Sequence, residues 1–435
     1  MHLTRTQVII LGILGLVILI GALMFLGILP GLRSKTPEAL SGKLTIWGPI
    51  DTPDIFRDSL FAAYQQLRPG VEISYRQMDE ATYEEDIIDA LAAGTGPDIF
   101  LVKNTWLPKH FEKLYPLTSS QLPIENIRTL YPSVIEQDLT ANENVYGLPL
   151  SIDTLALYYN KQMFDNAGVA EPPRTWEQFV NLIPRLRSLD KTGKITLAAA
   201  AIGGSIKTIP TAGDLISLLL LQDNVKMTDD SFTAATFSRD GEKPFRSYIG
   251  YANSANLNYT WNDNFSPALD AFSQEEVAMI FDYADKQKLL KAKSPFLNFA
   301  IAPMLQKADT KTAVNYAQYW ALGVSTKSQN IALAWDFVLA ASTNPTINES
   351  YLRTSGRSPA LRSLINKNIN DPIIGIFSRQ ALTTKSWRQI DASFISTTFS
   401  QMIESVITGK SPADRALKTA EEAISALMRR KNQTQ

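Results

Sequence analysis

The first part of the chain alternates between short apolar runs and longer segments with helical periodicity. Residues 55–69 and 81–94 place apolar side chains at the spacing of one helix face, and Asp54 is expected to cap the first of these helices. Three runs are rich in β-forming residues and are typical of strands: 43–47, 71–78 and 98–102. The order strand, helix, strand, helix, strand predicts a parallel, doubly wound α/β sheet.

The pattern changes in the middle of the chain. Residues 145–160 predict a strand pair with tight turns, and a helix is expected to begin near Thr175, with Glu177 and Gln178 in its first turn, as in a capping box. The later elements are strands at 194–202, 298–305 and 319–326, a helix end followed by a strand and a turn within 272–285, and helices at 329–342 and 411–430. The last helix is amphipathic.

The N-terminal segment is apolar without interruption. Val8 to Leu29 contains no charge and is long enough as a helix to cross a hydrocarbon core of about 30 Å. The alternative is a cleaved signal peptide, but those have apolar regions of about 7–15 residues, and the sequence after Leu29 offers no good cleavage site. We therefore favour an uncleaved transmembrane anchor at 8–29, followed by a polar linker at 30–42.

Length, charge and composition narrow the class of protein. A chain of 435 residues is too long for one ordinary core and suits two domains. The formal net charge of −1 gives no electrostatic case for nucleic-acid binding. Cysteine is absent, which excludes disulfides, iron–sulfur sites and thiol nucleophiles.

Candidate chemistry from isolated residues is sparse. With only His2 and His110 as imidazoles, we expect no zinc site, no other metal site and no cofactor. His110 lies in a polar helical stretch and is expected to be solvated rather than catalytic. The acidic residues 84–86 are likewise expected to form a solvated helix face.

Seven segments, taken together, resemble a known family. They are "KLTIWGPID", "AAGTGPDIFLV", "NVYGLPLSIDTLALYYNKQMFDNAG", "PPRTWEQF", "FSQEEVAMIFDYAD", "YWALGVSTKSQNIALAWDFV" and "GKSPADRALKTAEEAI". In this order and spacing they resemble the extracellular solute-binding proteins of ABC importers, above all the group of sugar binders similar to maltose-binding protein. The resemblance covers nearly all of residues 43–430.

The resemblance implies a two-lobed periplasmic-binding-protein-like fold (type II), here preceded by one N-terminal transmembrane helix. Lobe 1 would comprise 43–153 plus 322–360, and lobe 2 would comprise 154–321 plus 361–435. A ligand would lie in the cleft between the lobes. The family works outside the cytoplasmic membrane, so the anchor would hold the body on the extracytoplasmic side of the cell membrane, near an ABC transporter permease.

Asp153 is an acidic residue in an otherwise apolar stretch. A carboxylate in such a run is costly to bury unless something pairs with it. The resemblance places it on the first segment that crosses between lobes, at the floor of the cleft, where it would accept hydrogen bonds from ligand hydroxyls. The alternative is a hinge carboxylate that caps backbone amides or pairs with Arg357.

Other cleft candidates also follow from the resemblance, because sugars need aromatic platforms and planar polar groups. The aromatic candidates are Trp47, Trp106, Trp261, Tyr283, Tyr319 and Trp320, and the polar ones are Asp51, Asp282 and Arg357. Alternatives stay open: core packing for Trp47, helix capping for Asp51 and hinge anchoring for Arg357. Asp282 and Tyr283 stand where the family often has glycine and tryptophan, and the added carboxylate would favour a polar or cationic ligand.

These features favour a non-enzymatic, membrane-tethered receptor that delivers a carbohydrate to an ABC importer by hinge closure. One alternative is a sensory or scaffold protein of the same fold that signals to a membrane partner. Another is a cleft glycosidase that uses Asp153 and Asp282 as its two carboxylates. The family is non-catalytic and no general acid is evident, which argues against the second.

Overall fold

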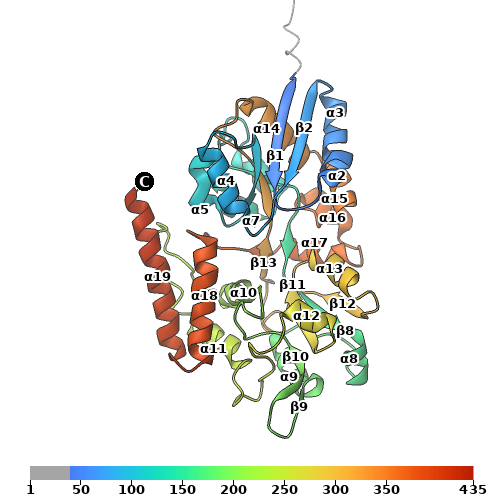
Figure 1. The fold of residues 1–435 in the computed structure, drawn as a ribbon, viewed down its shortest axis with the longest axis vertical. Coiled ribbons are helices and arrows are strands. Elements are labelled where there is room, and N and C mark those ends of the chain that lie inside the picture. The colour runs from blue at the N-terminus through green and yellow to red at the C-terminus, as the bar shows by residue number, and fades with distance from the viewer. Residues whose placement is uncertain (1–39, 435) are drawn as a thin grey trace, which may run out of the picture.

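Two five-stranded sheets organise the chain, one above the other, with a short three-stranded sheet between them (Figure 1). The computed structural model describes residues 40–434. The upper sheet contains, in spatial order, β2 (Val71–Gln77), β1 (Gly42–Gly48), β3 (Ile99–Lys103), β14 (Trp320–Val324) and β6 (Leu148–Pro149). Strands β2, β1 and β3 are parallel, as predicted, and β14 and β6 are antiparallel to their neighbours.

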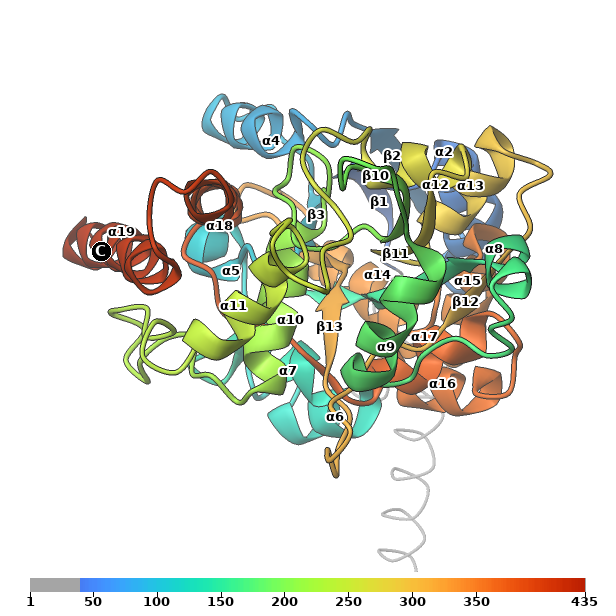
Figure 2. The ribbon, with the colours of Figure 1, turned by 90° about the horizontal axis from the view of Figure 1, so that it is seen from below.

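The lower sheet mixes parallel and antiparallel pairs. Its spatial order is β12 (Phe299–Ala302), β8 (Ala156–Asn160), β11 (Val277–Asp282), β10 (Ile195–Ala200) and β9 (Ser188–Leu189). The connecting sheet contains β15 (Thr384–Lys385), β13 (Asn315–Gln318) and β7 (Asp153–Thr154). Seen from below, β13 lies near the centre of the molecule (Figure 2). The chain therefore crosses between the two large sheets through β7 and returns through β13.

Helices cover both sheets. Around the upper sheet lie α2 (Pro53–Phe56), which continues through a π-helical turn (Arg57–Phe61) into α3 (Ala62–Leu67), then α4 (Tyr83–Ala92), α5 (Leu107–His110), α6 (Ile124–Leu130), α7 (Ser133–Leu139), α14 (Ile331–Thr343), α15 (Pro345–Ser355) and α16 (Arg362–Asn368). Helix α17 (Ile374–Ala381) follows α16 and packs against β7 and β13 of the connecting sheet. A 3-10 turn (Phe111–Lys113) and a small hairpin, β4 (Thr140–Ala141) and β5 (Asn144–Val145), complete this part.

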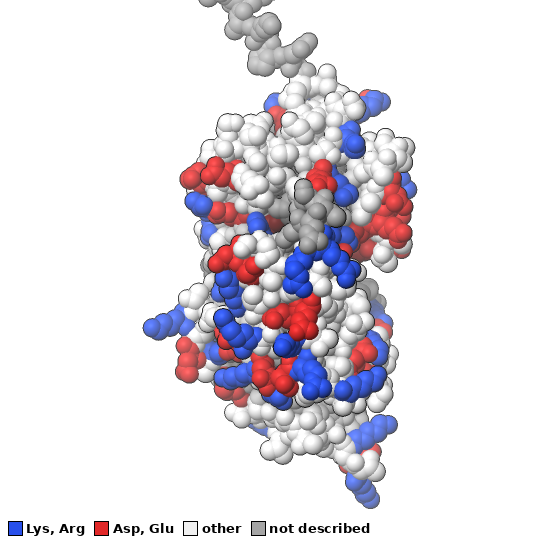
Figure 3. All heavy atoms as spheres, turned by 90° about the vertical axis from the view of Figure 1, so that its left-hand side faces the viewer, with Lys and Arg blue, Asp and Glu red and all other residues white. Residues whose placement is uncertain are grey.

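The remaining helices surround the lower sheet. They are α8 (Lys161–Asn166), α9 (Trp176–Leu186), α10 (Ala212–Gln222), α11 (Glu242–Gly250), α12 (Ala268–Ser273), α13 (Lys286–Lys293), α18 (Ala392–Ile407) and α19 (Ala413–Thr434). The last two form a pair along one side of the molecule (Figure 1). On that side, acidic and basic side chains are interspersed rather than segregated by sign (Figure 3).

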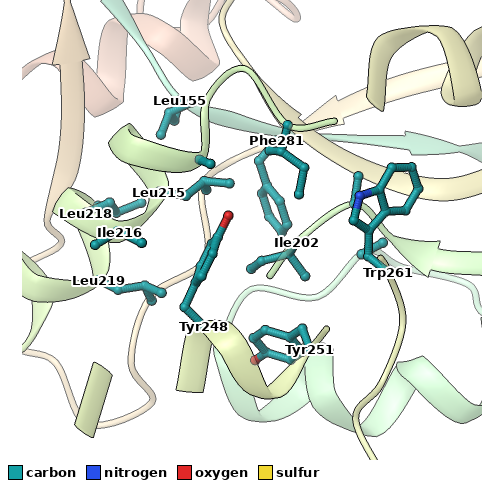
Figure 4. Close-up of a cluster of buried hydrophobic side chains, with 14 of the residues drawn as sticks. Leu155, Ile202, Leu215, Ile216, Leu218, Leu219, Tyr248, Tyr251, Trp261 and Phe281 are labelled. Atoms are coloured by element: carbon teal, nitrogen blue, oxygen red, sulfur yellow. The ribbon is translucent and has the colours of Figure 1, made fainter. Parts of the chain in front are cut away.

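Each large sheet has its own hydrophobic core, and we define the two lobes by these cores. The lobe-1 core draws on residues 44–152 and 317–365, together with Ala381. The lobe-2 core draws on 155–316 and 387–428, and Figure 4 shows part of it, with side chains of α10 packed toward Tyr248 and Phe281. Helix α16 departs from the predicted division, because Leu364 and Ile365 are buried in lobe 1 rather than in lobe 2.

Of the two predicted helix caps, one is confirmed and the other is wrong. Thr175 caps α9 as predicted: its hydroxyl accepts a hydrogen bond from the Gln178 N–H over 3.2 Å, and Gln178 Oε1 accepts one from the Arg174 N–H over 2.8 Å. The prediction for Asp54 is wrong. Thr52 occupies the N-cap position of α2, and Asp54 lies inside the first turn, paired with Arg57 over 2.7 Å.

The predicted anchor at 8–29 and most of the linker at 30–42 lie outside the described residues. Within residues 40–434, none of the helices combines the length and the apolar character needed to cross a membrane.

Candidate functional site

A cavity of about 300 Å³ lies between the two lobes, where β3 of lobe 1 and β11 of lobe 2 end. Lobe 1 lines it with Lys103, Asn104 and Thr105, and β13 passes along it. Lobe 2 lines it with the start of α10, the residues that follow β11 and one face of α18. The carboxyl ends of strands at an interface between lobes are the usual place for a ligand in α/β folds.

Tyr283 joins two carboxylates on the lobe-2 wall of this cavity. Its hydroxyl donates a hydrogen bond to Asp214 Oδ2 over 2.8 Å, and its backbone N–H donates one to Asp282 Oδ1 over 2.9 Å. Asp214 lies in the first turn of α10, and Asp282 is the last residue of β11. The wall thus presents an aromatic ring between two hydrogen-bond acceptors.

Burial raises the pKa of both carboxyl groups. The pKa of Asp282 is about 7, because burial outweighs the Tyr283 N–H and the positive charge of Lys286. Burial also raises the pKa of Asp214, against the charge of Lys103 and the hydrogen bond from Tyr283. The lobe-2 wall therefore disfavours free negative charge and would be stabilised by further hydrogen-bond donors.

Lowering the pH from 7 toward 4 is expected to increase the contribution of Asp282 to the free energy of unfolding. An unfolded aspartate has a pKa of about 3.9, and the folded pKa is about 7. Between these values the folded state binds more protons, so stability falls as the pH rises. Urea unfolding of the ligand-free chain and of Asp282→Asn across this range checks the sign, since the variant should lack this contribution. Equal slopes of stability against pH would contradict it.

The lobe-1 wall carries a cation and an unpartnered hydroxyl. The Lys103 ammonium lies 5.9 Å from the centroid of the Trp320 ring. Thr105 is only 8% exposed, and its Oγ1 has no hydrogen-bond partner among the described residues. Buried polar atoms are nearly always hydrogen-bonded, so this hydroxyl indicates a partner that comes from the cavity.

Of the residues predicted from the sequence, Asp282 and Tyr283 line the cavity. Tyr319 is buried behind it, with its hydroxyl donating to Asp138 Oδ2 over 2.8 Å. Trp106 and Trp320 pack edge to face in lobe 1, with ring centroids 5.4 Å apart, beside the lobe-1 wall. Direct contact of these three rings with a ligand stays a prediction.

Asp51, Asp153 and Arg357 gather elsewhere, at a smaller hinge pocket of about 120 Å³. The Arg357 guanidinium donates to the Asp51 carboxylate over 2.9 to 3.1 Å, and the Tyr351 hydroxyl donates to the same group over 2.7 Å. Asp51 has a left-handed backbone with φ of 62°, which aspartate tolerates better than most residues. Arg357 thus pairs with Asp51 within lobe 1. Contact of Asp51 or Arg357 with a ligand stays a prediction, as does the anchoring of the hinge by Arg357.

Asp153 caps a turn. Its Oδ1 accepts hydrogen bonds from the N–H groups of Thr154 and Ala284, over 2.7 and 3.0 Å, and its Oδ2 accepts one from the Asp285 N–H over 3.3 Å. Burial and the charge of Asp285 raise its pKa. Asp153 therefore ties the first crossing segment to the turn after β11, which is the hinge role considered as the alternative. Ligand contact by Asp153 stays a prediction.

Two predicted tryptophans lie away from both pockets. Trp47 is partly buried at the end of β1, with the Arg76 guanidinium 4.7 Å from its ring centroid. Trp261 is completely buried in the lobe-2 core, where it stacks on Phe265 and donates from Nε1 to Thr208 Oγ1 over 3.0 Å. Figure 4 shows Trp261 beside Ile202 within this core.

The expected solvation of His110 and Glu84 is wrong. His110 is only 3% exposed, and its Nε2 lies 2.7 Å from Glu84 Oε1. Lys109 Nζ bridges Glu84 over 2.8 Å and Asp391 over 2.7 Å. Helix α4 therefore turns this acidic side chain toward α5 and not toward solvent.

The Lys109–Asp391 pair is also a contact between lobes, because Asp391 is the N-cap of α18. A second contact lies on the hinge side. There Lys288 of α13 donates to the carbonyl oxygen of Ser355 at the end of α15.

Lys103, Thr105 and Asp214 were not among the predicted site residues. Lys103 ends β3, Thr105 lies in the loop that follows it, and Asp214 lies in the first turn of α10, all at the cleft edge of their lobe. For Lys103 and Thr105 the available signal was their position within three residues after the predicted buried strand 98–102. For Asp214 it was an acidic residue at the start of a very apolar helix, after a strand and a loop.

Comparison with known proteins agrees with the two-lobed architecture. The family model described as "Bacterial extracellular solute-binding protein" matches residues 50–345. A maltotriose-binding protein of Pyrococcus abyssi is 26% identical over 153 residues, and the match spans 35% of this chain and 32% of that protein. A multiple sugar-binding protein of Streptococcus mutans is 21% identical over 271 residues, which is 59% of this chain and 62% of that protein.

Solved structures show the same fold over most of the chain. The sugar-binding protein MalE of Xanthomonas citri superposes with a TM-score of 0.74 at 17% identity, covering 90% of this chain and 99% of that one. A cyclic α-maltosyl-1,6-maltose binding protein of Arthrobacter globiformis also gives a TM-score of 0.74, at 18% identity, covering 90% and 100%. Since the family model alone spans well over half of the sequence, the chain belongs to the bacterial extracellular solute-binding protein family.

Proposed function

We propose that this chain is an extracytoplasmic receptor that binds a saccharide between its lobes and delivers it to the permease of an ABC importer. The observation that carries the proposal is the interlobe cavity, which joins polar groups from both lobes around aromatic rings. Such a mixture suits sugars, whose apolar faces pack on rings while their hydroxyls need acceptors and donors.

The same geometry supports closure of the lobes around the ligand. Lys103 and Thr105 belong to lobe 1, whereas Asp214, Asp282 and Tyr283 belong to lobe 2. A ligand that contacts both walls at once binds the closed arrangement more tightly than the open one, and so shifts the population toward it. The hinge would lie at β7 and β13.

Sugars are favoured as the ligand class because several relatives are sugar-binding proteins by name. The relatives and structural neighbours given above are binding proteins, which favours a receptor over an enzyme. The family description "extracellular" supports a location outside the cytoplasm. We further propose that residues 8–29 tether the receptor in the cell membrane, which would keep it near its permease and raise its effective concentration there.

Replacing Thr105 with valine tests the cavity as the saccharide site. Valine has nearly the shape of threonine, and the hydroxyl has no partner in the described structure, so folding should be nearly unaffected. Loss of one hydrogen bond of about 1 kcal/mol to the ligand should weaken binding roughly 5-fold to 10-fold. The measurement is a thermal-shift screen of the full chain against saccharides, in a detergent without a sugar headgroup, followed by titration of the hits.

Thr326→Val is the matched control, because Thr326 follows β14 at the opposite edge of the lobe-1 sheet and is exposed. Its affinity should equal that of the wild type. A saccharide that binds Thr105→Val as tightly as the wild type would exclude the lobe-1 wall from the saccharide site. A chain that binds peptides or phosphates but no saccharide would refute the proposed substrate class.

A further inference from the structure

Ion pairing of the charged groups that line the interlobe cavity is incomplete. These groups are Asp214, Asp282 and Lys286 on the lobe-2 side and Lys103 on the opposite wall. Lys286 is paired over 2.7 Å with Asp285, which lies outside this lining at the hinge pocket. With Lys286 engaged in that pair, Lys103 is the cation of the lining that remains opposite the two carboxyl groups.

Neither Asp214 nor Asp282 forms an ion pair with another side chain in residues 40–434. Each accepts one hydrogen bond, in both cases from Tyr283, and each keeps a second carboxylate oxygen for another donor. Asp282 is only 7% exposed, so that donor has to come from the cavity. The buried, unpartnered hydroxyl of Thr105 on the opposite wall independently indicates a bound ligand.

A ligand that carries positive charge suits this wall better than a neutral one. Enclosing an uncompensated carboxylate is costly. Hydroxyl groups can satisfy its hydrogen-bonding capacity, but they do not balance its charge. An ammonium group does both, because it donates hydrogen bonds and also carries the opposite charge. A phosphate or a carboxylate on the ligand would instead add negative charge beside two acidic side chains.

We infer that the ligand is an amino saccharide whose protonated amino group lies against Asp282 and Asp214, while Lys103 and Thr105 contact its hydroxyl groups. This inference rests on the proposed saccharide-binding function and narrows its substrate class. Lys103 opposes the carboxylates from the other lobe, so the amino group is placed at the lobe-2 wall and not at the lobe-1 wall.

Matched sugars test the inference, because they differ only in whether one carbon carries an amino, an acetylamino or a hydroxyl group. The full chain, in a detergent without a sugar headgroup, is titrated calorimetrically at neutral pH with glucosamine, N-acetylglucosamine and glucose. The corresponding β-1,4-linked disaccharides, which are deacetylated chitobiose, N,N′-diacetylchitobiose and cellobiose, follow in the same way. The free amine of a series should bind at least about tenfold more tightly than its acetylated and hydroxyl counterparts.

Two isosteric variants locate the charge. Asp282→Asn and Asp214→Asn keep the shape of the wall but remove the carboxylate, and at least one of them should abolish the preference for the amine. Either variant should alter the affinity for the hydroxyl counterpart much less. Glu72→Gln is the matched control, since Glu72 is an exposed carboxylate at the lobe-1 surface, and it should leave the preference unchanged.

The outcomes separate this inference from the function on which it rests. Equal affinity for amine and hydroxyl sugars would overturn the inference and keep the saccharide receptor. Binding of maltose or maltotriose with no binding of any amino sugar would likewise overturn the inference and keep the saccharide receptor. Failure of every saccharide to bind would overturn both. A preference for the amine that survives in both aspartate variants would show that these carboxylates do not hold the amino group.

Discussion

Asp51→Asn is expected to lower the free energy of unfolding by about 3 kcal/mol, because it leaves the Arg357 guanidinium without its anion. The side chains of Asp51 and Arg357 are 8% and 22% exposed, so solvent cannot fully replace the lost partner. Asparagine tolerates the left-handed backbone at this position, which separates the loss of charge from backbone strain. Urea unfolding of the full chain measures the change.

The double variant Asp51→Asn with Arg357→Met provides the second arm. Methionine removes the stranded cation and fills part of its volume, so the double variant should be more stable than Asp51→Asn alone. Lys43→Met, which breaks an ion pair with side chains 81% and 72% exposed, is the matched surface control and should have little effect. A loss below about 1 kcal/mol for Asp51→Asn would mean that this pair behaves like a surface pair.

Trp261→Ala is expected to lower the stability of the chain by about 3–5 kcal/mol, the usual cost of removing a fully buried large aromatic side chain. Trp261 has no exposed surface, stacks on Phe265 with ring centroids 4.4 Å apart, and donates to Thr208. The substitution would leave a cavity in the lobe-2 core and would remove the hydrogen bond that the Thr208 hydroxyl accepts, although this hydroxyl would still donate to Asp263. The midpoint of thermal unfolding and the urea midpoint should both fall.

Trp261→Phe tests whether Trp261 serves only to pack the lobe-2 core or also contacts a ligand in the cleft. Phenylalanine keeps a ring in the core and should destabilise the chain less than alanine does. Saccharide affinity should then equal that of the wild type, because the ring lies in the core and not on the cavity wall. A large loss of affinity in a variant that remains folded would instead support the contact with ligand predicted from the sequence.

Much of the fold could be predicted from the sequence because its signals are local. The parallel strands at the start of lobe 1 combine β-forming residues with helix-period segments between them, and Thr175 has the spacing of a capping box. Asp54 and His110 show the limit of such signals. An acidic residue near a helix start can be the N-cap or can lie within the first turn, and a histidine in a polar stretch can be buried against a helix that is distant in the sequence.

The site was less predictable because it is assembled across lobes. Asp282 and Tyr283 could be proposed through the resemblance, because they stand in the turn where the family often has glycine and tryptophan. Asp214 could not, because its partnership with Tyr283 joins positions far apart in the chain. Asp153 was identified as unusual, yet its backbone partners at Ala284 and Asp285 follow only from how the turn after β11 folds against the hinge.

The contacts of Lys109 with Asp391 and of Lys288 with Ser355 join the two lobes through protein groups alone. Free energy that they supply toward bringing the lobes together is free energy that a ligand does not need to supply, so they raise apparent affinity. The same contacts would raise the fraction of empty receptors in the closed conformation, which an importer would recognise as ligand-bound. These two lysines would therefore balance high affinity for a dilute solute against binding of empty receptors to the importer. Stronger contacts between the lobes would raise the affinity but would lower the efficiency of transport.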